Sequence, residues 1–170
     1  MPALPDKLRL NLLAVSVGGA VMMTPVSIKW FEGIRHTPYY DVAGVLTVCW
    51  GHTGPDIIRG KYYSTAECEV LLDKDLKPVF AVIDRYVKVP LDEYQKTALA
   101  TFIYNVGTGA FTHSTLLKKL NRGDFFGASD EMRRWVFADG KKWQGLISRR
   151  EAERAIFRMG MDNEPILFAD

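Results

Sequence analysis

Residues 32–53 read EGIRHTPYYDVAGVLTVCWGHT. From residue 39 to residue 50 this stretch is rich in Tyr, Val, Leu and Thr, which are typical of strands. Gly44 interrupts the run, and Gly51 and Gly54 close it. Glycines at these places favour turns, so the pattern predicts a small antiparallel hairpin or meander.

The pattern becomes helical after this stretch. Ser64-Thr-Ala-Glu67 has the form of a capping box, which predicts a helix that begins near Thr65. Apolar residues then recur at helical spacing up to Gly107, a natural helix stop, and predict a buried central helix. These residues are Leu91, Ala98, Leu99, Phe102, Ile103 and Val106.

Short helices are expected at 114–121, 125–136 and 149–159, and a second capping box, Ser148 to Glu151, precedes the last one. Trp135 and Trp143 are expected in the core. The fold class is therefore α+β: a mainly helical domain with a small antiparallel sheet, preceded by an N-terminal apolar, membrane-active helix. The chain of 170 residues is long enough for one such domain.

The residues from Leu10 to Ile28 carry no charge. As a helix they would extend about 28 Å, close to the hydrocarbon thickness of a bilayer. Their glycines and polar residues make the predicted span marginal. We expect residues 1–30 to form a signal-anchor segment and residues 31–170 to form the catalytic domain.

Two other interpretations of this segment remain open. Lys7 and Arg9 followed by an apolar run, with a small-residue cut at Gly18-Gly19-Ala20, would suit a cleaved signal peptide. A core helix is the second, because apolar residues at 10, 13, 17, 20 and 21 can share one face. The flanking charges are nearly balanced and do not decide the orientation.

The net charge is +2, and basic pairs cluster in the last third of the chain. Such pairs usually form a solvated face; the alternative is attraction to a polyanion such as cell wall, nucleic acid or anionic lipid. The sequence contains no nucleic-acid motif with interleaved aromatic residues, so we expect no nucleic-acid partner.

The chain contains two cysteines, Cys49 and Cys68. A disulfide between them is favoured over two reduced thiols if the domain is exported, because that compartment is oxidising. Their spacing fits no zinc ligand set, and no metal site is expected.

The candidate catalytic residues follow the spacing Glu-x8-Asp-x5-Thr: Glu32, Asp41 and Thr47. Cleavage of a glycosidic bond needs one acid to protonate the leaving oxygen and a second group to manage water. Thr47 adds a hydroxyl for that water. The spacing alone is a weak pattern, and the residues around it make it a strong one.

The stretch from Glu32 to Thr53 resembles the active-site signature of phage-type lysozymes, which are muramidases. A block from Tyr104-Asn105-Val-Gly107 through Phe111 and residues 114–117 is similar to the same family. So is Gly145-Leu-Ile-Ser-Arg149-Arg150-x-x-Glu153, and the resemblance covers about residues 31–159. It implies hydrolysis of the β-1,4 bond between N-acetylmuramic acid and N-acetylglucosamine in peptidoglycan, without a metal or organic cofactor.

The resemblance also implies residue roles. Glu32 would be the general acid, and Asp41 and Thr47 would hold or activate the attacking water, with inversion favoured. Arg149 aligns with a family arginine near the catalytic glutamate; an ordinary helix-surface arginine is the alternative. His52 matches a hydrogen-bonded structural histidine of the family pattern.

Two further residues are candidates for substrate binding. Tyr40 would line a sugar cleft or fill the hairpin core. Asn105 would hydrogen-bond an N-acetyl group or cap the helix beside Gly107. Both alternatives stay open for each residue.

Many relatives have glycine where this chain has Cys49. A cysteine there accompanies Cys68 in lysozymes that are more similar to this chain, the signal-arrest-release endolysins of lambdoid phages. Those proteins enter the inner membrane through an uncleaved segment, wait there inactive facing the periplasm, and become soluble in the periplasm when the membrane potential collapses. The resemblance implies a holin or pinholin as functional partner.

Some of those relatives stay inactive through a cysteine inside the membrane segment. The segment from Leu10 to Ile28 contains no cysteine, so latency in this chain would rest on geometry. The released segment would pack on the domain as Glu32 moves into place. Two other functions are weighed against a muramidase: a membrane-anchored, non-catalytic wall-binding protein and a lytic transglycosylase. The set Glu32, Asp41 and Thr47 argues against the first, and the effect of Asp41→Asn would discriminate the second.

Overall fold

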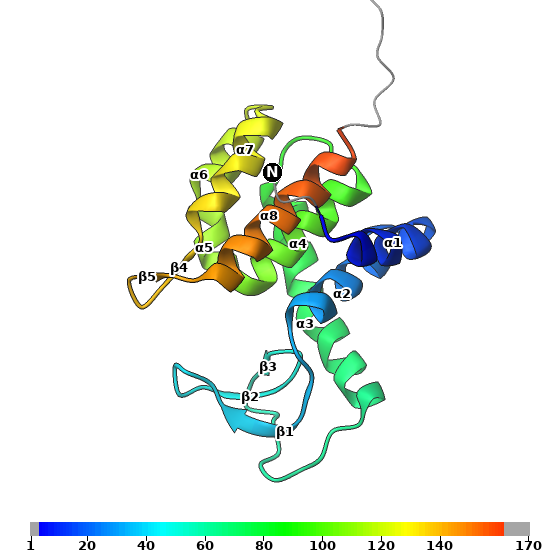
Figure 1. The fold of residues 1–170 in the computed structure, drawn as a ribbon, viewed down its shortest axis with the longest axis vertical. Helices are drawn as coiled ribbons and strands as arrows, with labels where there is room; N and C mark the ends of the chain where they lie inside the picture. Colours follow the sequence, from blue (N-terminus) through cyan, green and yellow to red (C-terminus); the bar gives the residue numbers. More distant parts are fainter. Residues whose placement is uncertain (1–3, 162–170) are drawn as a thin grey trace, which may run out of the picture.

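The fold has two lobes, which a long helix joins. The structure is a computed structural model that describes residues 4–161. Figure 1 shows a larger helical lobe and a smaller lobe that contains β1, β2 and β3, with α3 running between them. The expected α+β class is confirmed: the described chain is mainly helical, with small antiparallel sheets.

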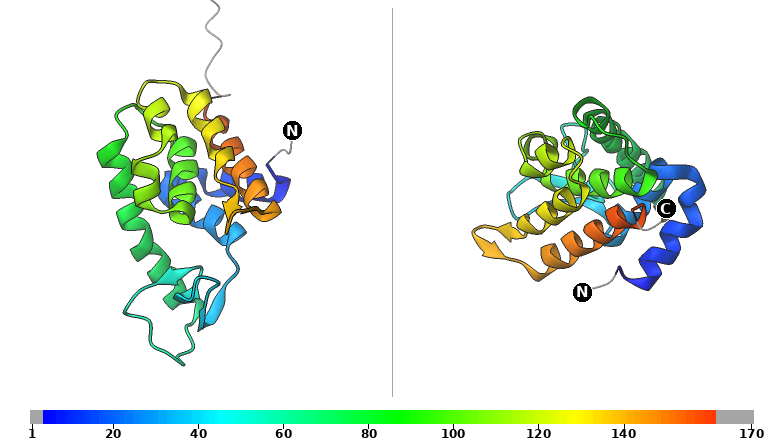
Figure 2. Two further views of the ribbon diagram at one scale, coloured as in Figure 1. Left: turned by 90° about the vertical axis from the view of Figure 1, so that its left-hand side faces the viewer. Right: turned by 90° about the horizontal axis from the view of Figure 1, so that it is seen from above.

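The N-terminal apolar segment forms two helices rather than one. Helix α1 spans Asp6–Val15, a 3-10 turn η1 spans Ser16–Gly18, and α2 spans Gly19–Phe31. Figure 2 shows the two helices meeting at a corner on the outer edge of the molecule. Within residues 4–161, this is the one helical stretch long and apolar enough to cross a membrane.

The break between α1 and α2 has a tertiary cause. Gly19 has φ +64°, which glycine adopts without strain, and the amide of Ala20 donates to Glu93 Oε2 at 2.6 Å. A carboxylate at a helix N-terminus is favourable, because it meets free N–H groups and the positive end of the helix dipole. The inner side of both helices joins the main hydrophobic core through Leu8, Leu12, Met23 and Ile28.

The predicted hairpin is present in the small lobe. Strands β1 (Arg35–Tyr40), β2 (Leu46–Cys49) and β3 (His52–Thr53) form an antiparallel sheet in that order, with Tyr39 opposite Thr47. The first strand begins at residue 35, four residues before the stretch that the sequence indicates. The glycine that breaks the run, Gly44, has φ +75° in the connecting turn.

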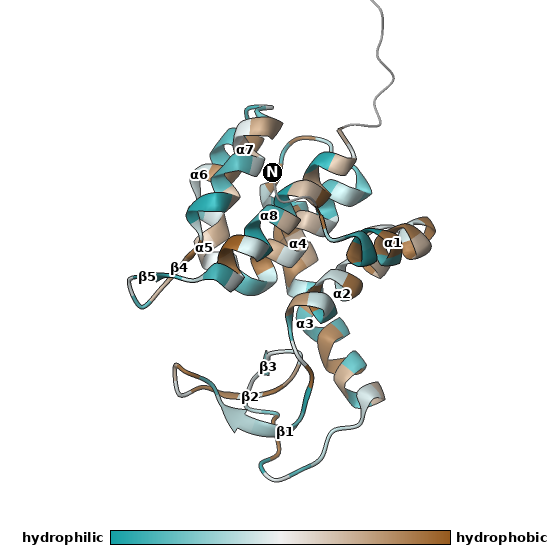
Figure 3. Ribbon diagram, viewed as in Figure 1, coloured by the Kyte–Doolittle hydropathy of each residue, from teal (hydrophilic) through white to brown (hydrophobic). Residues whose placement is uncertain are grey.

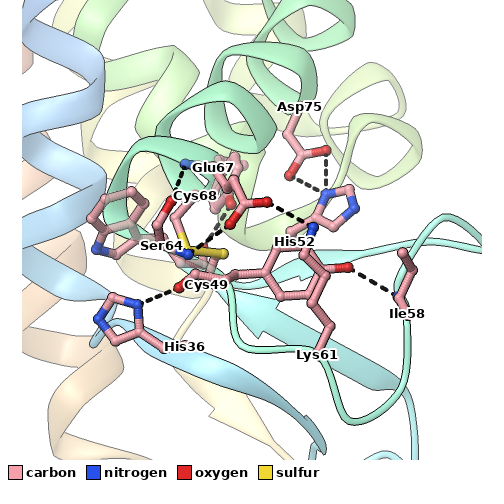
Figure 4. The surroundings of a disulfide bond; sticks show 12 residues. His36, Cys49, His52, Ile58, Lys61, Ser64, Glu67, Cys68 and Asp75 are labelled. Atoms are coloured by element: carbon pink, nitrogen blue, oxygen red, sulfur yellow. Dashed lines mark hydrogen bonds and ion pairs between the residues drawn. A yellow bond between two sulfur atoms is a disulfide. The ribbon is translucent and has the colours of Figure 1, made fainter.

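A disulfide fastens the small lobe to α3, which spans Thr65–Tyr86. Cys49 follows Val48 at the end of β2 and is bonded to Cys68 in the first turn of the helix, as Figure 4 shows. The helix begins where the sequence predicts, with both hydrogen bonds of the Ser64–Glu67 capping box present. Cys49 has φ +61°, a conformation that glycine adopts more easily.

His52 adds a second link between the small lobe and α3. The histidine is buried, and its Nδ1 lies 2.9 Å from the Asp75 carboxylate. Its Nε2 lies 3.1 Å from Asp56 Oδ1. Hydrogen bonds from Lys74 and His52 lower the pKa of Asp56 to about 2. The structural interpretation of His52 agrees with these contacts.

The helical lobe is built around α4, which spans Glu93–Val106 and is largely buried. It ends at Gly107, as predicted, where φ is +93°. Helix α2 packs against α4, and so does α8, which spans Gln144–Met159. Three short helices, α5 (Thr108–Thr112), α6 (Thr115–Leu120) and α7 (Phe125–Glu131), complete the lobe, and a 3-10 turn η2 (Met132–Arg134) follows them.

Several predictions for the last third of the chain are wrong. The helix expected at 125–136 corresponds to α7, which ends at Glu131. The turn η2 extends to Arg134, and a hairpin of β4 (Phe137–Ala138) and β5 (Lys141–Lys142) follows. Helix α8 begins at Gln144, so Ser148 lies inside it and caps nothing. Trp143, expected in the core, is 53% exposed beside the hairpin, whereas Trp135 is partly buried against Phe102.

Candidate active site

Glu32 lies at the junction of the two lobes. It is the first residue after α2, and its amide donates to the carbonyl of Ile28 at 2.8 Å. Its side chain is 28% exposed, and Oε1 accepts a hydrogen bond of 2.5 Å from Arg149 Nη1. A charge-assisted bond of this kind fixes the carboxyl while leaving it partly open to solvent.

Arg149 is held from several directions. The side chain is 6% exposed, and its Nε donates to Glu153 Oε1 at 3.1 Å. Nη2 lies 3.4 Å from the carbonyl oxygen of Thr101 on α4, and the guanidinium carbon lies 5.0 Å from the ring centre of Phe31. The arginine therefore joins α8, α4 and the end of α2. Arg149 is therefore not an ordinary helix-surface arginine.

A second arginine shares the same buried carboxylate. Arg150 and Glu153 are both fully buried, with Arg150 Nε 2.9 Å from Glu153 Oε2. Burial raises the pKa of Glu153, and the charges of Arg150 and Arg149 oppose that rise. Burial also lowers the pKa of Arg150.

Asn105 belongs to this cluster. Its Oδ1 accepts a hydrogen bond of 2.7 Å from Arg150 Nη2. The helix cap beside it is Gly107, whose amide donates to Ile103, so the capping alternative for Asn105 does not hold. Glu153 was not among the predicted site residues. The i to i+4 spacing from Arg149 and the i to i+3 spacing from Arg150 were the signal that could have found it.

Asp41 and Thr47 lie on either side of the turn between β1 and β2. Oδ1 of Asp41 accepts from the amides of Ala43 at 2.9 Å and Val45 at 2.8 Å. The buried Thr47 donates its hydroxyl to the Val45 carbonyl oxygen at 2.9 Å. The amide and the carbonyl of one residue, Val45, thus hold both side chains, and β1 connects the turn to Glu32.

Tyr40 ends β1 and is exposed. Its ring centre lies 5.7 Å from the guanidinium carbon of Arg59. A side chain in this position does not fill the hairpin core, which removes one of its two alternatives. Its neighbour Tyr39 is partly buried and lies 4.4 Å from the guanidinium carbon of Arg35.

A hollow of about 220 Å³ lies where β3, α3 and α4 meet, and Asp75, Tyr104 and Gly107 are among the residues that line it. The hydroxyl of Tyr104 donates to the Trp50 carbonyl oxygen at 2.7 Å, which links α4 to the small lobe. Burial raises the pKa of Tyr104, and the charges of Asp75 and Glu32 raise it further. A larger groove of about 780 Å³ lies between α2 and α3 and contains none of the candidate site residues.

The comparison with known families matches residues 29–153 to the phage lysozyme family. The chain belongs to the phage lysozyme family. It is 60% identical over 164 residues to a "SAR-endolysin" of Escherichia phage Mu, covering 94% of this chain and 95% of that protein. Among the residues that the structure describes, no group of His, Cys, Asp or Glu side chains is suited to a metal ion.

Solved structures agree with this assignment. A variant of the phage P22 lysozyme is 34% identical, has a TM-score of 0.70, and the match covers 81% of this chain and 94% of that one. The active form of the P1 phage endolysin is 18% identical, has a TM-score of 0.75, and the match covers 95% and 97%. The latter likeness concerns the fold alone. Family and relatives together make this phage lysozyme an endolysin with lysozyme-type glycosidase activity.

Proposed function

We propose that this phage lysozyme hydrolyses the β-1,4 bond between N-acetylmuramic acid and N-acetylglucosamine in peptidoglycan, and thereby lyses the host cell. The observation that carries the proposal is the partly exposed Glu32 carboxyl at the junction of the lobes, oriented by the buried Arg149. A fixed acid that solvent can still reach is what protonation of a glycosidic oxygen requires.

Glu32 acts as the general acid in this proposal. Arg149 binds Oε1, so Oε2 is the atom that carries the proton to the leaving oxygen. Glu153 has a supporting role in this proposal. It lies against Arg149 and Arg150 and balances part of their charge.

Asp41 and Thr47 position the attacking water. Two amides of the turn hold Oδ1 of Asp41, which leaves Oδ2 to accept a hydrogen bond from water. The Thr47 hydroxyl donates to the Val45 carbonyl oxygen, so its lone pairs are oriented to accept from the same water. Water that attacks the sugar face opposite the leaving group gives inversion. Tyr40 and Asn105 are proposed to support substrate binding, Asn105 through its bond to Arg150.

The test is substitution with product analysis. Glu32→Gln keeps the shape of the side chain and should lower wall hydrolysis by roughly 10²–10⁴-fold while circular dichroism stays native. Asp41→Asn should also lower it strongly, and the released sugar should be the inverted anomer with a normal reducing end. Full activity of Glu32→Gln would refute the assignment.

Two outcomes would favour the alternatives. A non-reducing anhydro sugar, with little effect of Asp41→Asn, would make the protein a lytic transglycosylase. Wall binding without hydrolysis by the wild-type chain would make it a wall-binding protein.

The location of the enzyme is the second part of the proposal. The residues from Leu10 to Ile28 would insert in the inner membrane as an uncleaved anchor, with the catalytic domain in the periplasm, until a holin or pinholin collapses the potential. A membrane-spanning helix cannot at the same time pack α2 against α4, and Glu32 follows α2 directly. The anchored form would therefore lack the contact between Glu32 and Arg149.

Intact mass and lytic activity of membrane and soluble fractions, measured before and after depolarisation, test this location. A full-length mass that moves from an inactive membrane fraction to an active soluble one would support release. A soluble product shortened by about twenty to thirty residues would identify a cleaved signal peptide instead. A full-length mass that stays in the membrane would exclude release.

A further inference from the structure

The groove of about 780 Å³ between α2 and α3 contains none of the candidate site residues. Its floor is apolar: Leu72 and Leu76 are buried there, and Val15, Val26 and Phe80 line it as well. A hollow of this size and composition has room for a row of apolar side chains from a partner helix. We call it the α2–α3 groove.

The rim of the groove on the α3 side is acidic. Asp73 and Asp84 are exposed, and their separation in the sequence places them about 16 Å apart along the helix axis. Glu69 is neutralised by Lys29, whose Nζ lies 2.7 Å from Glu69 Oε1. Lys77 is the other basic residue among those that line the groove. The groove therefore favours a partner that has an apolar face with positive charge beside it.

Helix α1 of the same chain presents an apolar face to solvent. Leu10, Leu13 and Val17 follow the i, i+3, i+7 spacing of one helix face, and they are 66%, 43% and 103% exposed. We call these three residues the outer face. Figure 3 shows apolar residues on the ribbon of α1 and α2 at the edge of the molecule. Soluble monomers rarely expose large apolar side chains next to one another, which indicates a binding surface.

Basic residues lie beside the outer face. Lys7 and Arg9 are exposed on α1, where Asp6 is the one acidic residue. Residues 7–17 extend about 15 Å along the helix, close to the separation of the two rim carboxylates. Because Asp73 and Asp84 lie toward opposite ends of the groove, the basic end of α1 would meet a carboxylate in either direction of approach.

We propose that two folded copies of this chain form a reciprocal pair, in which the outer face of each copy occupies the α2–α3 groove of the other. Val15, Val21 and Met22 line the groove at the corner where α1 and α2 meet, so the groove and the outer face are neighbours on one surface. A two-fold axis beside that corner brings both contacts into one interface, which is the geometry of a closed dimer.

The pair would leave both candidate active sites open. In Figure 1 the corner of α1 and α2 lies on one side of the molecule, whereas the β1–β2 turn and the β4–β5 hairpin point to the other. The second copy would also stabilise the folded arrangement of α1 and α2, because it binds only that arrangement. The inference concerns the folded protein in solution and does not depend on the reaction that Glu32 performs.

Sedimentation velocity of the purified, full-length, folded protein tests the pair without lipid or detergent. The wild type should show monomer and dimer in an equilibrium that depends on concentration, and added salt should weaken the dimer. Two variants reverse the charges: Lys7→Glu/Arg9→Glu on α1 and Asp73→Lys/Asp84→Lys on the rim. Each should raise the dissociation constant by about tenfold or more, because like charges then face each other in both contacts.

A mixture of the two variants is the decisive measurement. In the mixed pair the reversed α1 meets the reversed rim, and the unchanged α1 meets the unchanged rim. Both contacts are complementary again, so the mixture should form dimers as the wild type does. The apolar variant Leu10→Ser/Val17→Ser should also raise the dissociation constant about tenfold. The matched control Lys118→Glu/Arg122→Glu reverses two exposed basic residues elsewhere and should stay within about twofold of the wild type.

Several outcomes would overturn the proposal, provided that circular dichroism shows every variant to be folded. A wild type that stays monomeric at all concentrations would do so, and if it then sediments with lipid vesicles, the outer face binds lipid instead. A dimer that neither charge reversal weakens would also contradict it, as would a loss of dimer that the mixture does not restore. Species whose mass keeps growing with concentration would mean an open chain of copies and would exclude the reciprocal pair.

Discussion

The guanidinium of Arg149 lies 2.5 Å from the Glu32 carboxylate, although 117 positions separate the two residues in the chain. Glu32 follows the last residue of α2, and Arg149 lies in α8. Both helices pack against α4, so the contact exists only when all three are assembled. The arrangement of the candidate acid therefore depends directly on where the N-terminal segment lies.

Replacement of Arg149 by alanine should lower both stability and activity. The change leaves Glu153 in the core with one arginine fewer, and removal of one partner from a buried ion pair costs about 3–5 kcal/mol. Urea unfolding measures the stability, and wall hydrolysis measures the activity.

Arg133→Ala is the matched control. It removes an exposed arginine that binds Glu151 through two hydrogen bonds, and exposed pairs contribute about 1 kcal/mol or less. Equal stabilities of the two variants would show that the buried cluster is not held together by charge.

Glu153→Gln should lower the free energy of unfolding. The substitution keeps the shape of the side chain but removes the negative charge that lies against the two buried arginines, Arg149 and Arg150. Removal of one partner from a buried ion pair costs about 3–5 kcal/mol, and urea unfolding measures that cost. A free energy of unfolding equal to that of the wild type would contradict the proposed charge balance between Glu153 and the two arginines.

The parts of the fold that sequence predicts well are set by neighbours in the chain. The Ser64–Glu67 capping box closes within four residues, and Gly107 ends α4 through its own backbone conformation. The hairpin around Gly44 is likewise local, because Asp41 binds amides two and four residues further on. In each case the interaction that fixes the structure is visible in the sequence.

The features that were missed depend on distant partners or on very short elements. The break before α2 is stabilised by Glu93, which lies 73 positions away from Ala20. Strands of two residues, such as β4 and β5, carry no readable period. For the site, residue spacing and family resemblance named Glu32, Asp41 and Thr47, whose catalytic roles stay predictions. The contacts of Glu153 with Arg149 and Arg150 became visible only in the packing of α8.

Gly19→Ala should destabilise the folded arrangement of the N-terminal helices. Gly19 has φ +64°, and a Cβ there would lie 2.5 Å from Glu93 Oε2. Strain and the loss of the Ala20–Glu93 hydrogen bond together should cost about 1–3 kcal/mol, measured by urea unfolding. Gly145→Ala, in the first turn of α8 with open space around it, is the control and should be neutral or slightly stabilising. Similar values for both variants would mean that α2 does not depend on this contact.

Removal of the disulfide should weaken the small lobe, with a cost that depends on the residue placed at position 49. The bond closes a loop with a sequence separation of 19, for which chain entropy predicts about 3 kcal/mol of stabilisation. The variant Cys49→Ala/Cys68→Ala loses this and keeps a side chain at φ +61°. Cys49→Gly/Cys68→Ala loses the bond but relieves the backbone, so it should be more stable than the alanine pair by about 1 kcal/mol. Urea unfolding of the oxidised wild type and both variants would measure the three values.

Equal stability of the two variants would show that the disulfide imposes the left-handed conformation of Cys49. The expected order would show that the turn after β2 requires this conformation even without the bond.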